Sequence, residues 1–126
     1  MASRTYDNLT LLKDAGVVTV DAAAQVAGAA RVVDVGDAHL DAIAVVDTSA
    51  VDVSGGNAYT VRIQGSLLLA FGTPVELAAR EVKTTGRLEI PFNNEVSGTY
   101  YRYIRAFNDT SGATPTINST IYLAKP

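Results

Sequence analysis

The chain has 126 residues, a net charge of −3 and no cysteine. This length suits one domain with its own hydrophobic core, formed without disulfides or thiol chemistry. The excess of acidic residues disfavours a nucleic-acid partner, and apolar runs such as Ser66–Phe71 are too short to span a membrane. The opening MASRTYDNLT lacks the basic region and apolar run of a secretory signal, so we expect assembly in a cytoplasm.

The first 28 residues are rich in Ala, Val and Asp and have no firm hydrophobic period. The run DNLTLLKDAG predicts a short helical turn ending near Gly16, and VVTV predicts a strand at Val17–Val20. Such a strand can bury its apolar side chains by adding to an exposed sheet edge, either its own or that of a neighbouring subunit. We therefore expect residues 1–28 to form an extended arm that is mobile in the isolated protein. The interface candidates in this arm are Val17, Val18 and Val20.

Residues 29–126 show the pattern of a β-sandwich domain. Asp41–Asp47 is almost continuously apolar, which predicts a strand covered on both faces, whereas 58–64 alternates with Tyr59, Val61 and Ile63 inward. In 74–80 the side chains of Val75, Leu77 and Ala79 share one face. The expected strands are 31–35, 41–47, 58–64, 74–80, 86–92, 98–108 and 116–124. With turn signals roughly every 8–12 residues, we expect an all-β, antiparallel, jelly-roll-like β-sandwich of seven or eight strands.

The segment GTYYRYIRAFN, residues 98–108, carries aromatic side chains on both faces of its expected strand. One face holds Tyr101, Tyr103, Arg105 and Phe107. Tyr and Arg are enriched at protein interfaces because each combines a large contact area with a polar tip. These four residues are therefore interface candidates, and an ordinary central strand packed under a loop is the alternative.

The sequence offers few groups for catalysis. His39 is the only histidine, and its setting GDAHLDA is a turn before a strand, which does not suit a nucleophile pair. Asp34, Asp37 and Asp41 could gather around calcium, but they lack the ligand spacing of an EF-hand, and Asp beside Gly is common in turns. We expect no enzymatic activity, no catalytic residues, no metal site and no cofactor.

Five segments follow one another between about Val32 and Ala124: LDAIAVVDTSAV, GGNAYTVRIQGS, PVELAAR, GRLEIPF and YYRYIRAFNDTSGATPTINSTIYLA. Their order resembles that of the small capsid cement or decoration proteins of tailed bacteriophages. In that family a strand like YTVRIQGS precedes a variable loop, and a segment like RLEIPF leads into an RYLR-type strand, here Arg102–Arg105.

The resemblance implies a jelly-roll-like sandwich on the exterior of a phage head. It implies dimers or trimers that bridge subunits of the major capsid protein, without enzymatic activity. Ile104 and Ala106 would then face the core, and the opposite face of their strand would be covered by the arm, a sister subunit or the capsid shell. A carbohydrate- or receptor-binding module of a phage tail is the alternative function.

Overall fold

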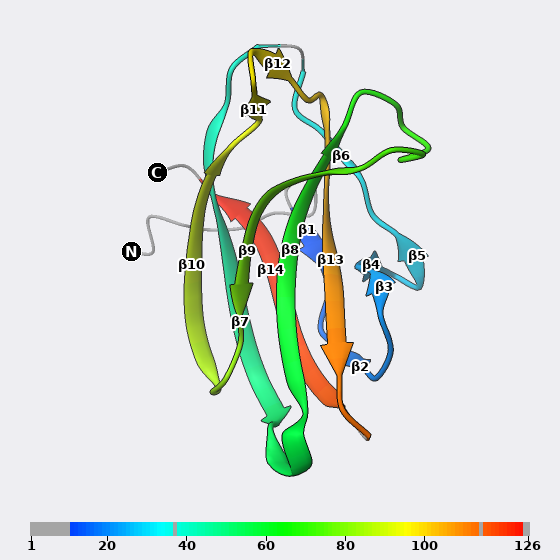
Figure 1. Ribbon diagram of the computed structural model, residues 1–126, viewed down its shortest axis with the longest axis vertical. Helices are drawn as coiled ribbons and strands as arrows, with labels where there is room; N and C mark the ends of the chain where they lie inside the picture. Colours follow the sequence, from blue (N-terminus) through cyan, green and yellow to red (C-terminus); the bar gives the residue numbers. More distant parts are fainter. Residues whose placement is uncertain (1–10, 37, 114, 125–126) are drawn as a thin grey trace.

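The computed structural model describes residues 11–36, 38–113 and 115–124, which form two antiparallel sheets packed face to face (Figure 1). The first sheet has the order β1 (Leu11–Lys13), β14 (Thr116–Ala124), β7 (Asp41–Asp52) and β10 (Gly86–Asn93), with β2 (Val17–Val18) also on β14. The second has the order β3 (Ala22–Ala23), β13 (Tyr103–Ser111), β8 (Ala58–Ser66) and β9 (Val75–Glu81), with β6 (Val33–Asp34) also on β13.

Two small hairpins and one turn complete the described part of the chain. The hairpins pair β4 (Gln25–Val26) with β5 (Ala29–Ala30) and β11 (Glu95–Val96) with β12 (Thr99–Tyr100). A single 3-10 turn, η1 (Ser54–Gly56), joins β7 to β8. No helix in these residues is long and apolar enough to cross a membrane. The predicted all-β antiparallel sandwich is confirmed.

The strands pair in a nested order around the turn between β8 and β9. Proceeding outward from that turn, β8 pairs with β9, β7 with β10, β3 and β6 with β13, and β1 and β2 with β14. Two further pairings, β7 with β14 and β8 with β13, join this folded ribbon into two sheets.

The main core lies between the two sheets. Tyr59, Val61 and Ile63 of β8 point into it, as their alternation predicts, and Ile117 and Ile121 reach it from β14. A bulge between Ile63 and Gln64 changes the register with β9, so Ala78 rather than Ala79 packs against the core. The predicted alternation of 74–80 is therefore wrong beyond Leu77, because a bulge inserts one extra residue into a strand.

The outer face of the first sheet is covered by the amino-terminal segment. Five successive residues of β7, Ala42–Val46, are buried, which confirms that this strand is covered on both faces. Ile43 and Val45 point outward and pack with Tyr122 beneath Leu11 and Val26. The segment before β7 therefore acts as a layer of the fold.

Several predicted boundaries are wrong. Leu11–Lys13 is a strand rather than a helical turn, because the edge of β14 offers it hydrogen-bond partners. β7 continues to Asp52 and β13 to Ser111, through segments expected to be loops. Leu12 is 0% exposed within the main core. The described part of the arm, from Leu11 onward, is thus extended as predicted, but it contributes to both sheets and to the core.

Candidate interaction surface

The predicted aromatic face is only partly present on β13. Ile104 and Ala106 are fully buried, which confirms that they face the core, and Tyr103, Arg105 and Phe107 lie half-buried on the outer face. Because β13 begins at Tyr103, Tyr101 does not continue this face. The chain leaves the strand conformation between Tyr100 and Tyr103, so side chains before and after this gap need not alternate between the same two faces.

Tyr101 turns towards the interior beside Gly65 of β8. Its backbone N–H donates to the carbonyl of Asn94 at 2.7 Å, and Asn94 is fully buried. A Cβ on Gly65 would lie 2.9 Å from the Cβ of Tyr101 and 3.1 Å from Cδ1 of Leu77. Only glycine leaves room for Tyr101 at this position.

The outer face of β13 is covered by the loop between β8 and β9, residues 67–74, which we name the leucine loop. Phe71 of this loop is buried, and its ring centre lies 4.5 Å from the guanidinium carbon of Arg105. Arg105 also donates from Nε to Oε1 of Gln64 at 2.8 Å. Burial lowers the pKa of Arg105. Within the chain, the cover is therefore this loop, as the alternative of a central strand packed under a loop predicts, and not the arm that was one of the three covers implied by the resemblance.

A second row of this face is polar and internally paired. Arg62 of β8 donates from Nη1 to Glu76 of β9, and its Nη2 lies 2.9 Å from Oδ2 of Asp109 on β13. These two carboxylates raise the pKa of Arg62 through their hydrogen bonds. All three side chains are partly accessible to water, so the pairs contribute little stability. They do leave Arg62 neutralised on the surface of the sheet.

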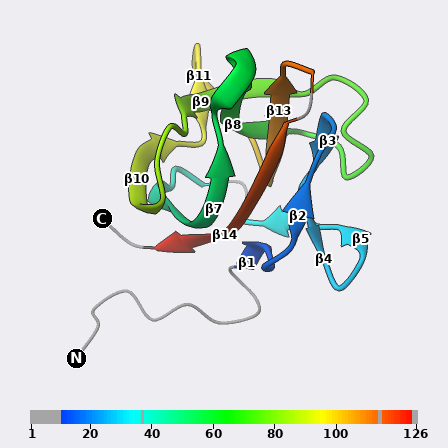
Figure 2. The same cartoon turned by 90° about the horizontal axis from the view of Figure 1, so that it is seen from below.

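The leucine loop also exposes three consecutive leucines that the sequence analysis missed. Leu67, Leu68 and Leu69 are 57%, 67% and 63% exposed. The loop projects from one side of the sandwich (Figures 1 and 2). Phe71 has a left-handed backbone and donates to the carbonyl of Leu68 at 3.1 Å, which folds the loop back. The available signal was the apolar run followed at once by Gly72-Thr73-Pro74, a turn sequence.

Tyr101 lies next to these leucines. It lines a shallow groove of about 410 Å³ with Ser66, Leu67, Leu68, Thr73 and Val75. On the other side of the loop, Leu69 and the segment 30–34 line a broader hollow. The structure thus brings one predicted interface residue, Tyr101, to the exposed leucines. It keeps Tyr103, Arg105 and Phe107 on the outer face of β13, where Arg105 lies between the rings of Phe71 and Phe107.

The predicted arm residues lie on a different part of the surface. Val17 and Val20 are 61% and 64% exposed, whereas Val18 is half-buried and packs against the core. β2 pairs with β14, so this strand adds to a sheet edge of its own chain, which is one of the two expected possibilities. The side chains of Val17 and Val20 remain available at the surface.

The acidic residues around His39 are engaged in local contacts. Arg102 holds Asp34 through two hydrogen bonds of 2.9 Å, which lower the pKa of Asp34 together with a bond from the Gly36 N–H. His39 lies 3.0 Å from Asp41 and meets the ring of Tyr100 edge-on. Asp37 lies outside the described residues. Among those described, no cluster of three or more potential ligands could hold a metal.

Comparison with known proteins does not place the chain in a family. No family model matches the sequence, and no curated protein matches it significantly.

Proposed function

We propose that this protein is a structural virion protein, a decoration protein that binds the outer surface of a phage head and bridges subunits of the major capsid protein. The observation that carries the proposal is the leucine loop, which exposes Leu67, Leu68 and Leu69 beside the groove of Tyr101. Contiguous apolar surface of this kind marks sites of protein contact on water-soluble domains. The resemblance of the segment order to capsid cement proteins supplies the class of partner.

The sandwich suits a bridging role because its contact sites sit on a rigid frame. The leucine loop is anchored by Phe71 on the outer face of the second sheet, so its leucines are held in place before binding. A preorganised loop loses less conformational entropy on binding. Val17 and Val20 offer a second apolar contact, and dimers or trimers of the protein would multiply these contacts across a shell.

Co-sedimentation with capsids assembled from the major capsid protein of the same genome tests the proposal. Replacing Leu67, Leu68 and Leu69 by Ser should weaken binding about tenfold or more, a loss of about 1.4 kcal/mol per factor of ten. The melting temperature should change little, because these side chains are exposed. A matched triple change at Thr84, Thr85 and Arg87, also exposed, should leave binding intact. A monomeric protein that ignores these capsids would refute the proposal.

One observation supports the alternative of a carbohydrate- or receptor-binding module. Tyr100 is 39% exposed and stands beside His39, with Asp41 and Glu95 close to the imidazole. An aromatic ring next to carboxylates can stack on a sugar and accept its hydroxyl hydrogen bonds. Binding to a glycan panel that is lost in Tyr100→Ala, without binding to capsids, would favour this alternative.

A further inference from the structure

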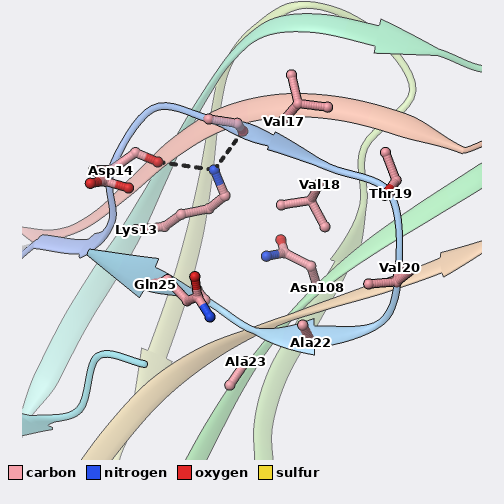
Figure 3. A pocket seen from close by; sticks show the side chains of 12 residues that line it. Lys13, Asp14, Val17, Val18, Thr19, Val20, Ala22, Ala23, Gln25 and Asn108 are labelled. Atoms are coloured by element: carbon pink, nitrogen blue, oxygen red, sulfur yellow. Dashed lines mark hydrogen bonds between the residues drawn. The ribbon is translucent and has the colours of Figure 1, made fainter. Parts of the chain in front are cut away.

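A small cavity opens where the amino-terminal segment crosses from one sheet to the other. Residues 13–25 run from β1 through β2 on the first sheet to β3 on the second, and the loop they form encloses the opening (Figure 3). The cavity has a volume of about 270 Å³. This is just below the range of about 300–1,000 Å³ for drug-sized ligands, so its occupant is the size of a side chain or a small fragment.

The carboxamide of Asn108 reaches this cavity from β13. Asn108 continues the inward-facing series of Ile104 and Ala106 and is only 4% exposed. Its side chain forms no hydrogen bond with any described residue, although it lines the opening together with Val18 (Figure 3). The fully buried side-chain atoms without a partner in the described residues belong to Thr48 and Ser119, so the carboxamide of Asn108 reaches water through the opening. A ligand with matching hydrogen-bonding groups can replace that water.

The surroundings of Asn108 favour a neutral occupant. The ammonium of Lys13 already donates to the carbonyls of Asp14, Gly16 and Ser119 at 2.9, 3.0 and 2.6 Å. The Asp14 carboxylate accepts the N–H of Ala27 at 2.8 Å. The remaining wall is mostly aliphatic, with Val18 and the alanines at 22–24. A charged ligand would lose its hydration without gaining a free counter-ion.

We propose that this cavity binds a short aliphatic group that ends in a carboxamide. An amide both donates and accepts, so it can form two hydrogen bonds with the carboxamide of Asn108 while its aliphatic part packs against Val18 and Ala22. Such a group occurs as the side chain of Gln or Asn on a bound protein and as a free small amide. The site does not depend on the capsid proposal, since it rests on Asn108 and on the walls formed by Val18 and Ala22, which that proposal does not use.

Titration of the ¹⁵N-labelled protein with isobutyramide, followed by NMR, tests the site. We expect saturable shifts of the Asn108 side-chain amide and of the backbone amides at 17–24, with a dissociation constant in the millimolar range typical of so small a ligand. Two matched probes define the recognition. In 3-methylbutan-2-one a methyl replaces the amide nitrogen, and isobutyrate carries a charge, so both should bind more weakly. Equal binding of the ketone, or no saturable shift with the amide, would overturn the proposal.

Variants separate recognition from folding. Asn108→Leu removes the carboxamide at similar volume, so it should abolish binding without lowering the melting temperature. Ala22→Leu should block the cavity, because Ala22 lies directly across from Asn108 in the pairing of β3 with β13. Ala79→Leu adds the same group on β9, two strands from β13, and should leave binding unchanged. Retained binding in Asn108→Leu would contradict the assigned role of the amide.

Two blocked peptides identify the source of the ligand. Acetyl-Gly-Gln-Gly-amide presents the carboxamide as a protein would, and acetyl-Gly-Glu-Gly-amide is its charged control. We expect the Gln peptide to bind more tightly than isobutyramide, because Val17 and Val20 at the rim can contact its backbone. Binding of isobutyramide but of neither peptide would support the site for a free small amide.

Discussion

The guanidinium carbon of Arg105 lies 4.5 Å from the ring centre of Phe71 and 5.8 Å from that of Phe107. Arg105 thus ties the leucine loop to the outer face of β13. The stacking is a cation–π contact in a partly desolvated place, where such pairs are strongest. The position of the exposed leucines depends on this contact.

Phe71→Ala should lower the free energy of unfolding by about 2–4 kcal/mol, because it removes a buried ring. In a double-mutant cycle with Arg105→Ala, we expect a coupling energy of about 0.5–2 kcal/mol. The corresponding cycle of Arg105 with Phe107 is the control and should give weaker coupling, since that ring is more distant. Urea unfolding curves measure both cycles. Equal coupling energies in the two would contradict the conclusion that Phe71 is the stronger partner of Arg105.

Leu12→Ala should cost about 2–5 kcal/mol, the usual loss for a leucine buried in a core. Leu12 is 0% exposed between the sheets, although it belongs to the segment expected to be a separate arm. Val17→Ala, at an exposed position of the same segment, should change stability by less than about 0.5 kcal/mol. Chemical denaturation of both variants is the measurement. If Leu12→Ala lowered the free energy of unfolding only slightly, residues 1–28 would instead be an arm that does not contribute to the core.

Gly112→Ala should destabilise the protein by about 2 kcal/mol or more, because two effects combine there. Gly112 has a φ of 109°, and a Cβ would lie 2.2 Å from Oδ1 and 2.7 Å from the Cα of Asn57. Gly28→Ala is the matched control: its φ of 81° is also positive, but nothing lies within 4 Å of the new Cβ. Its cost should be the strain alone, about 1–2 kcal/mol. Denaturation midpoints of the two variants are the measurement. Equal losses for Gly112→Ala and Gly28→Ala would show that the clash with Asn57 adds no cost.

The stability of the protein at alkaline pH should depend on the lowered pKa of the Lys13 ammonium. Burial lowers the pKa of its ammonium below the ordinary 10.5, although the Asp14 carboxylate acts in the opposite direction. Between the folded and the unfolded pKa, the unfolded chain binds more protons, so stability rises with pH in that window. Below the folded pKa the cost of burying the charge is present in full.

Melting temperatures measured from neutral pH to pH 10.5 test this effect. The alkaline rise should disappear in Lys13→Met. Lys83→Met removes an exposed lysine and should leave the profile unchanged, so the difference between the two variants cancels the contribution of tyrosines. Identical profiles for the wild type and Lys13→Met would show that the ammonium is not desolvated.

The sandwich could be predicted from local pattern, because a strand with one face in a core must alternate. Tyr59, Val61 and Ile63 do so and are buried. Tyr101 could not be placed in this way, since its backbone turns to hydrogen-bond Asn94 before β13 begins. The pattern of side chains carries no information about such a break.

The leucine loop and the amino-terminal segment were harder to predict for another reason. Leu67–Leu69 looks like part of a strand, and only the fold shows that Phe71 takes the buried position and leaves the leucines outside. Leu11 and Leu12 need β14 as a partner, and β14 lies more than 100 residues further along the chain. No local feature indicates which distant edge a short apolar segment will meet.

The nested pairing sets the order in which the protein can be completed during synthesis. β8 and β9 are neighbours in the chain and can pair as soon as both have left the ribosome. β1 is made before every other described strand, yet its partner β14 is made after them all, with Lys13 and Ser119 joined across 106 positions. Until β14 emerges, Leu11 and Leu12 lack the strand that buries them. The nascent chain therefore carries an exposed apolar segment until β14 has been made, which is the interval in which a chaperone would find a target.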